Sequence, residues 1–446
     1  MNNKPYLLQF VCLLALLLAI LIQGLTHWIP MRPLDGFTDE TSPVKASFGT
    51  CYDGSFQKYL TAYAKQHTGF REFLIRNYNQ VCYSCFGKIT NNNIVKGGND
   101  ELYTTLYLNE ITGNRLREFD LDVESAKAQA RDNVEATLAF IDTLHRHGTE
   151  FLVIFAPSKT AVYPENLPKK YQKYLPYFSL EDYYIELYKE KGIPHIDFLT
   201  YFKDIKDEFP YPLYAKTGTH WAEATIPFVT DSIFRKIEEL TGYRMPSINY
   251  IDPNISADYS PIDGELEGNM NLLFPMRKPA IPNPVFTLCD TVGKDRLNLL
   301  VVGDSYFNQI RRSCFVDAFN QWDLWVYCES IQSSRPFYNG KHLNMVFDAG
   351  EVIEDADLVI SIFTSAFLPR YMFDFIPYAQ EQLQALHLSD EIAIQQIIDN
   401  IKNNPEWLRT IEQQATSRGV SLEQNIRENA EWVLRNVKKA KQEQQP

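Results

Sequence analysis

The sequence predicts an α/β fold in which helices flank a mostly parallel sheet. Short apolar segments such as Phe151–Phe155 and Asn298–Val302 have the length and composition of buried strands. Longer segments between them, such as Val123–His147, place apolar residues at helical spacing. This alternation is typical of a parallel sheet covered on both faces, because parallel neighbours are joined through helical crossovers.

Further segments extend the pattern along the chain. Strands are expected at Leu102–Leu108, Ile193–Phe198, Trp322–Tyr327 and Asp357–Phe363, and helices at Phe56–Gln80, Leu180–Lys191 and Trp221–Leu240. Residues 245–283 contain many turn-forming residues and are expected to form a long surface excursion. Ligands of such a sheet bind beyond the carboxyl ends of its strands, where Pro157, Ser305 and Thr364 are expected.

The chain divides into four predicted parts. Residues 1–28 are expected to form a transmembrane signal anchor, 29–50 a polar linker, 51–380 the α/β domain and 381–446 a helical tail. The run Tyr6–Leu25 is apolar and long enough to cross a bilayer, and no small-residue cleavage pattern follows it. We therefore favour an uncleaved, single-pass anchor in the inner (cytoplasmic) membrane with the body outside the cytoplasm, in the periplasm, over a cleaved signal peptide.

The tail contains three amphipathic helical patterns. Pro405 opens the second of them, and Ser421 with Gln424 forms a capping box for the third. Short helices of this kind need a surface that covers their apolar faces. Docking on the main domain and binding of a partner are both open.

The charge and the cysteine content restrict which partners and which cellular compartment are expected. The net charge is −13 and no basic run occurs, so nucleic acid is not expected as a partner. Six of the seven cysteines lie outside the apolar segment, and an even number is typical of an oxidising compartment with disulfides. The pair Cys82 and Cys85 has no second pair and no nearby histidine, so zinc is not expected there, and a structural disulfide or a few buried free thiols are the alternatives. No metal or other cofactor is expected in this chain.

A serine follows the strand Asn298–Val302 at a strand-to-helix corner. Gly303-Asp304-Ser305 turns the chain, and a helical pattern begins directly after it. Such a corner exposes the Ser305 hydroxyl at the edge of the sheet and leaves N–H groups of the helix start for an oxyanion. Asp304 is expected to orient the corner by accepting N–H bonds. The alternative is a helix-capping serine without chemistry.

A histidine provides the second element of acyl-transfer chemistry. His220 follows a turn and precedes Trp221, which can fix the ring. A base of this kind needs a carboxylate to hold its tautomer, and Glu223 or Asp197 are the candidates. A serine–histidine dyad and a purely structural histidine are the alternatives.

Three motifs in this order resemble the alginate O-acetyltransferase family with SGNH-hydrolase-like domains. They are Ala156–Pro168, Tyr214–Thr225 and Val301–Phe307, and Phe56–Gln80 resembles the opening of the family's domain. The resemblance runs from about residue 47 to 378. It implies an SGNH-hydrolase-like fold with Ser305 as nucleophile and His220 as base. Many members carry Asp-x-His, whereas Gly218 stands at the acidic position here.

The resemblance implies acetyl transfer to hydroxyls of an exported polysaccharide, with a membrane-bound O-acyltransferase as the acyl supplier. Ser305 and His220 from the resemblance, with Glu223 and Asp304 from the pattern of neighbouring residues, form the expected catalytic set. Lys159 and Lys216 are expected to line the mouth of the site, and Trp221 and Tyr306 to contact the acceptor. The alternatives are a carbohydrate esterase that uses water as the acceptor, and a catalytically silent scaffold.

Overall fold

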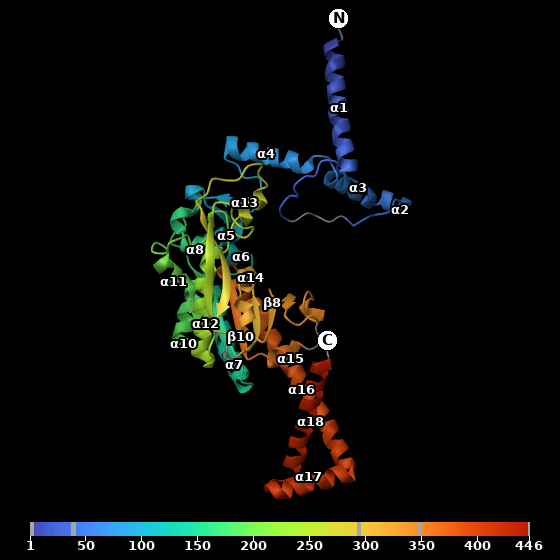
Figure 1. The fold of residues 1–446 in the computed structure, drawn as a ribbon, viewed down its shortest axis with the longest axis vertical. Helices are drawn as coiled ribbons and strands as arrows, with labels where there is room; N and C mark the ends of the chain where they lie inside the picture. The colour runs from blue at the N-terminus through green and yellow to red at the C-terminus, as the bar shows by residue number, and fades with distance from the viewer. Residues whose placement is uncertain (1–3, 37–41, 292–295, 346–348, 445–446) are drawn as a thin grey trace.

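The computed structural model describes residues 4–36, 42–291, 296–345 and 349–444. Its body contains a six-stranded sheet with the order β4-β3-β10-β7-β8-β9 (Figure 1). The strands are β3 (Glu150–Ala156), β4 (His195–Asp197), β7 (Asn298–Gly303), β8 (Gln321–Val326), β9 (Ser330–Ser333) and β10 (Leu358–Thr364). All neighbours pair in parallel except β8 and β9. The predicted mostly parallel α/β fold is therefore confirmed.

Helices cover both faces of the sheet, so its central strands are buried on both sides. In β3, Phe151 and Val153 belong to one apolar core while Leu152 and Ile154 belong to the other. The helices around the first core include α7 (Val123–Arg146), α10 (Leu180–Lys191), α15 (Ala349–Glu354) and α16 (Phe375–Asn403). Those around the second include α11 (Phe198–Ile205), α12 (Ile226–Thr241) and α14 (Ser305–Arg312). Neither face of the sheet is in contact with water, which explains why its central strands are apolar at every position.

The N-terminal region contains four helices, and the described residues between the first and second of them form neither helix nor strand. It contains α1 (Lys4–Thr26), α2 (Phe48–Tyr52), α3 (Ser55–Gln66) and α4 (Arg71–Phe86). The single helix expected over Phe56–Gln80 is wrong, because the chain breaks between α3 and α4. Gly69 lies in this break, where a Cβ atom would be 2.1 Å from the Ile20 carbonyl oxygen. Close approach of α1 therefore requires a glycine there.

Small elements surround the edge of the sheet where the strands end. They are β1 (Ile94–Lys96), β2 (Leu102–Thr104), α5 (Thr105–Ile111), α6 (Asn114–Arg117), α8 (Lys159–Val162) and α9 (Lys169–Gln172), with short 3-10 turns between them. The strand expected over Leu102–Leu108 is thus a three-residue strand followed by a helix. The excursion 245–283 is more ordered than expected: it contains β5 (Ser247–Ser256) and α13 (Glu265–Met270), and β5 pairs with β6 (Ile281–Cys289).

The tail forms a helical unit of its own. Helix α16 leaves the body and is followed by α17 (Pro405–Arg418) and α18 (Leu422–Gln444). These helices bury a shared core of Ile394, Ile398, Ile401, Ile411, Ile426 and Ala430. Their apolar faces therefore cover one another, which neither sequence-based alternative anticipated.

The seven cysteines are all free in the structure. The structure therefore shows none of the expected disulfides, and Cys51 and Cys85 lie exposed on different helices.

Candidate active site

The Ser305 corner is held by the carboxylate that precedes it. Ser305 is the first residue of α14, and Asp304 is its N-cap. Asp304 Oδ1 accepts the N–H of Tyr306 at 2.9 Å, and Oδ2 accepts the N–H of Thr364 at 2.8 Å. Burial raises the pKa of Asp304, and these N–H groups oppose the rise. Asp304 thus ties the corner to the end of β10, which is the positioning role expected for it.

The imidazole of His220 lies directly beside the serine. His220 Nε2 is 2.8 Å from Ser305 Oγ, although the two residues are 85 positions apart. Two side chains of α14 hold the histidine segment: Tyr306 Oη donates to the Thr219 carbonyl and Gln309 Nε2 donates to the Trp221 carbonyl, both at 2.9 Å. The helix that begins with the serine therefore also positions the base.

The carboxylate behind the ring is Glu265. Its Oε1 lies 2.8 Å from His220 Nδ1 and accepts the N–H of Thr219 at 2.9 Å. Burial by itself would raise the pKa of Glu265, but the hydrogen bonds and charge of His220 and the Thr219 N–H hold it below its ordinary value. Glu265 is therefore an ionised partner that fixes the Nδ1–H tautomer and leaves Nε2 free to accept a proton.

Glu223 does not occupy this position, which corrects the sequence-based expectation. Its backbone N–H donates to Asp263 Oδ1 at 3.1 Å, in the turn that leads into α12. The other candidate, Asp197, caps α11 through the Thr200 N–H and pairs with Lys189. The Asp197 carboxylate is committed to these contacts, and the acid on His220 Nδ1 is Glu265 rather than Glu223.

Gly218, in the second motif, leaves room for the chain segment that carries Glu265. A Cβ atom on Gly218 would lie 3.1 Å from the Asp263 carbonyl oxygen, so the segment before α13 packs tightly against this position. Thr217 Oγ1 donates to the same carbonyl at 3.1 Å, and the Leu266 N–H donates to the Thr217 carbonyl at 3.0 Å. A side chain at Gly218 would push away the helix that carries Glu265. In the sequence, the only sign of Glu265 was a cluster of acidic residues within 245–283, a segment without helical or strand periodicity.

Lys159 is a structural cation and does not line the mouth of the site. Its side chain is 2% exposed, and Nζ bonds the carbonyls of Leu102, Ala215 and Gly218, and Glu101 Oε2 at 2.7 Å. Burial lowers the pKa of Lys159, and Glu101 opposes this. Lys159 therefore fixes the segment that leads to His220. Lys216 is half-buried beside it, and only its backbone carbonyl accepts a bond from Lys159.

Trp221 and Tyr306 are fully buried and cannot contact an acceptor as expected. Their rings pack edge to face with centroids 5.2 Å apart, and the Tyr306 ring also lies 4.7 Å from the His220 ring. Both side chains form the apolar support beneath the imidazole. The sequence predicted that Trp221 and Tyr306 form a binding surface because they lie beside the motifs. In the structure they are part of the core at the edge of the sheet.

Sequence reasoning missed Tyr327, which follows β8 at the same edge. Its backbone has a positive φ of 54°, and its N–H donates to the Gly303 carbonyl at 2.8 Å. Burial raises the pKa of Tyr327, and hydrogen bonds from the side chain and backbone of Ser305 oppose the rise. The phenol thus lies against the serine. A signal existed, because β7 and β8 are neighbouring parallel strands that end side by side.

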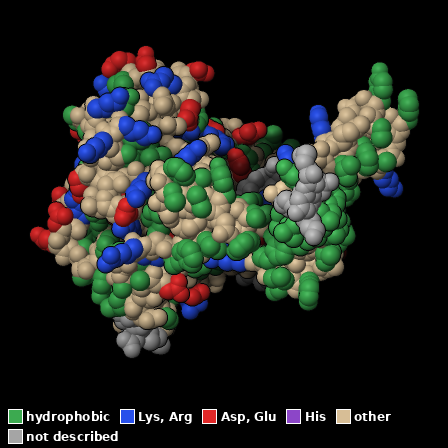
Figure 2. Space-filling view, turned by 90° about the horizontal axis from the view of Figure 1, so that it is seen from above, with side chains coloured by type: hydrophobic (Ala, Val, Ile, Leu, Met, Phe, Trp, Pro, Cys, Tyr) green, Lys and Arg blue, Asp and Glu red, His purple; other side chains and the backbone are tan. Residues whose placement is uncertain are grey.

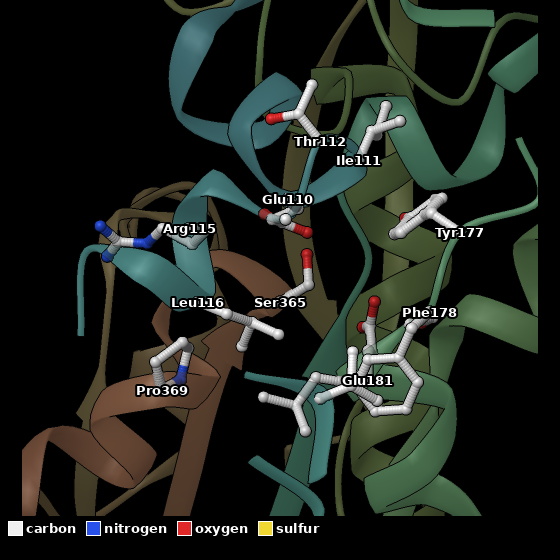
Figure 3. A pocket seen from close by; sticks show the side chains of 14 residues that line it. Glu110, Ile111, Thr112, Arg115, Leu116, Tyr177, Phe178, Glu181, Ser365 and Pro369 are labelled. Atoms are coloured by element: carbon white, nitrogen blue, oxygen red, sulfur yellow. The ribbon is translucent and has the colours of Figure 1, made fainter. Parts of the chain in front are cut away.

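A separate pocket of about 190 Å³ lies beyond the end of β10. Figure 3 shows the Ser365 hydroxyl turned toward the Glu110 carboxyl group, with Tyr177, Phe178 and Glu181 along the other side. Burial raises the pKa of Glu110 to about 8, and it raises that of Glu181 well above its ordinary value, with the charge of Glu110 adding to the rise. These carboxyl groups lie in a pocket that Arg115 also lines, and none of their contacts among the described residues reaches the serine or the histidine.

A metal could be held elsewhere, by His147, Glu354 and His387, whose ligand atoms lie within 4.8 Å of one another among the described residues. These three residues come from the end of α7, from α15 and from α16, and none of them belongs to the Ser305 site.

Comparison with known proteins agrees with the sequence resemblance. Residues 116–250 match the family model of the SGNH hydrolase-like domain, acetyltransferase AlgX. His220 lies inside the match, and Ser305 and Glu265 lie outside it. No curated protein sequence matches the chain.

Similar solved structures include three bacterial proteins. The O-acetyltransferase domain of Pseudomonas putida AlgJ is 15% identical, covers 62% of this chain and 92% of that one, and gives a TM-score of 0.38. Pseudomonas aeruginosa AlgX is 15% identical, covers 64% and 67%, and gives 0.39. Bacillus cereus PatB1 is 13% identical, covers 56% and 93%, and gives 0.35.

Proposed function

We propose that this chain, whose residues 116–250 match the family model of an SGNH hydrolase-like acetyltransferase domain, is an acyltransferase that moves acetyl groups to hydroxyls of an exported polysaccharide. The observation that carries the proposal is the continuous contact from Ser305 Oγ to His220 Nε2 and from His220 Nδ1 to Glu265, each at 2.8 Å. This is the arrangement that activates a serine hydroxyl for attack on an ester.

In the first half-reaction, His220 Nε2 accepts the Ser305 proton while Oγ attacks the acetyl carbonyl carbon of the donor. Glu265 stabilises the imidazolium that forms and keeps it aligned. The tetrahedral intermediate collapses, the bond to the donor oxygen breaks, and His220 returns the proton to that leaving oxygen. The product is an acetyl ester on Ser305.

The oxyanion of the tetrahedral intermediate needs donors beside Oγ. The N–H groups of Tyr306 and Phe307 already donate to Asp304, to its side chain and its carbonyl respectively. The Ser305 N–H and the Tyr327 hydroxyl instead face each other next to the serine. We assign these two groups as the oxyanion donors, because an oxyanion beside Ser305 Oγ would replace the Tyr327 oxygen as the acceptor of the Ser305 N–H while the Tyr327 hydroxyl donates to it.

In the second half-reaction, a sugar hydroxyl attacks the acetyl-serine. His220 removes the hydroxyl proton and then returns it to Ser305 Oγ as the acetyl group leaves. Water in place of the sugar would give an esterase with the same residues.

The N-terminal segment supports a place at the membrane. Helix α1 contains Tyr6–Thr26, which is long and apolar enough to cross a bilayer and is barely buried by the rest of the chain. We propose that it is an uncleaved anchor in the inner membrane, that residues 51–380 act as the transferase domain outside the cytoplasm, and that a membrane-bound O-acyltransferase supplies the acetyl group.

The proposal is tested by trapping the acetyl-serine. We expect the purified protein, mixed with p-nitrophenyl acetate and quenched in acid, to gain one acetyl group on the peptide that contains Ser305, and a polysaccharide acceptor to discharge it. Discharge by water at the same rate with and without polysaccharide would favour the esterase. A folded protein that never acquires the acetyl group would favour the silent scaffold.

A further inference from the structure

Helix α4 has the reverse of the polarity expected for a helix on a soluble protein. Its inward face buries Arg76 and Asn79. Its outward face exposes Leu74, Tyr78 and Val81, which are spaced four and three residues apart, so they lie on one side of the helix. Soluble surface helices turn their apolar side to the core. An outward apolar side is what a lipid surface requires.

The rotation of α4 is set by bonds from its polar face. Arg76 donates from Nη1 to the Arg32 carbonyl at 2.9 Å and from Nη2 to the Pro33 carbonyl at 2.7 Å. Asn79 Nδ2 donates to the Met270 carbonyl at 2.9 Å. These buried donors would lose their partners if α4 turned its apolar face inward, so the outward orientation is built into the fold.

The outward face of α4 is continuous with the candidate membrane-spanning helix. The end of α1 packs on the corner between α3 and α4, where a Cβ atom on Gly24 would lie 2.5 Å from the His67 carbonyl oxygen. Figure 1 shows α1 standing upright beside this corner while α4 lies across its direction. A helix that crosses a bilayer along α1 therefore leaves α4 roughly parallel to the membrane surface.

The charge and surface of this region agree with that placement. Residues 48–88 contain five Lys or Arg and two Asp or Glu, whereas the whole chain has a net charge of −13. Exposed aromatic side chains continue the apolar surface onto α2 and α3, at Phe48, Tyr52 and Tyr63. Figure 2 looks down on this end of the molecule and shows hydrophobic side chains gathered there with Lys and Arg among them. Aromatic and basic side chains together suit the headgroup region of a membrane.

We propose that α4, with the exposed side chains of α2 and α3, lies in the lipid–water interface of the membrane that α1 crosses. The proposal rests on the proposed role of α1 as an anchor. It has a consequence for the site, because α13 joins the two: Glu265 begins this helix and Met270, which accepts from Asn79, ends it. Six helical residues span about 9 Å. In this proposal, α13 holds the Glu265 carboxylate a short distance from the membrane surface. An acyl donor delivered across the bilayer would emerge at that surface, close to the site.

Photocrosslinking of the full chain in native membranes tests the placement. The crosslinking amino acid p-benzoylphenylalanine would replace Tyr78 or Val81 on α4, Leu14 in α1, or Phe337, an exposed aromatic residue on the body. After irradiation, mass spectrometry identifies the adduct on each peptide. We expect phospholipid adducts at Tyr78, Val81 and Leu14, and none at Phe337.

The four positions separate the possible failures. Lipid at Leu14 without lipid at Tyr78 and Val81 would overturn the interfacial placement and leave the anchor intact. Protein adducts at Tyr78 and Val81 would show that this surface binds a partner chain instead, and would also overturn it. Absence of lipid at Leu14 would remove the anchor, and the interfacial placement with it, while leaving the acetyl-serine chemistry unaffected.

Discussion

Glu265, at the edge with Ser305, and Glu181, in the pocket beside β10, are both largely shielded from water, but their pKa values shift in opposite directions. Glu265 receives hydrogen bonds from the Thr219 N–H and from His220, and its pKa falls. Glu181 has an oxygen without any hydrogen-bond partner among the described residues, and its pKa rises. Desolvation raises the pKa of both groups, so the hydrogen bonds together with the charge of His220 account for the opposite outcome at Glu265. A carboxylate supports general-base chemistry only where the fold provides those donors.

The largest expected effect comes from removing the nucleophile. Ser305→Ala should lower acetyl transfer by about a millionfold, to the background rate, because no other hydroxyl contacts His220 Nε2 among the described residues. The measurement is release of p-nitrophenol from p-nitrophenyl acetate, with circular dichroism to show that the variant is folded. Retained activity in a folded variant would place the chemistry elsewhere.

The next effect tests the donors around Glu265. Glu265→Gln should lower kcat by about 10⁴-fold, because an amide that donates to Nδ1 reverses the tautomer and protonates Nε2. Glu223→Gln is the matched control and should change kcat by no more than about twofold, since Glu223 does not contact the ring. Similar losses in both variants would restore Glu223 as the acid.

Two neighbouring lysines, Lys159 and Lys216, test whether a buried, hydrogen-bonded cation contributes more to the free energy of unfolding than a half-buried one. Lys159→Met should lower the free energy of unfolding by about 3 kcal/mol, because Glu101 and several buried carbonyls lose their donor. Lys216→Met should change it by less than about 0.5 kcal/mol. Urea unfolding measures both, and equal effects would contradict the structural role of Lys159.

The Tyr327 hydroxyl should contribute a smaller catalytic effect. Tyr327→Phe removes one assigned oxyanion donor and should lower kcat by about 100-fold with little change in KM. Steady-state kinetics with the p-nitrophenyl ester separates the two constants. A change confined to KM would indicate that the phenol binds the ground state and does not stabilise the oxyanion.

The smallest effect concerns the pH dependence of stability that Glu110 contributes in the pocket beside β10. The pKa of Glu110 is about 8 in the folded chain and 4.5 ordinarily, so the folded state retains a proton that the unfolded state releases. Stability is therefore lost as the pH rises from about 4.5 to 8. Glu110→Gln should remove part of this loss and gain about 2 kcal/mol at pH 8 relative to the unmutated protein.

Two measurements check the pocket. Urea unfolding of the Glu110→Gln variant and the unmutated protein should agree closely at pH 4.5 and separate toward pH 8. A constant difference across this range would mean that Glu110 is ionised in the folded protein, and that the pocket resembles the Ser305 edge after all.

Much of the site could be predicted because its first two residues lie next to strong local patterns. Ser305 follows a continuous apolar strand, and His220 follows a turn. Parallel strands end at one edge, so the general place of the serine followed from the alternation of helices and strands. Glu265 could not be found this way, because its contact with His220 joins positions 45 residues apart through a segment without periodicity.

The sequence by itself determined the α/β alternation, the corner at Ser305 and the apolar N-terminal helix, because each depends on the pattern of neighbouring residues. Tertiary structure alone decided which acid holds the imidazole, that Lys159 is buried, and that α4 turns its apolar side outward. Those outcomes depend on hydrogen-bond partners brought together from distant parts of the chain, and a local pattern contains no information about them.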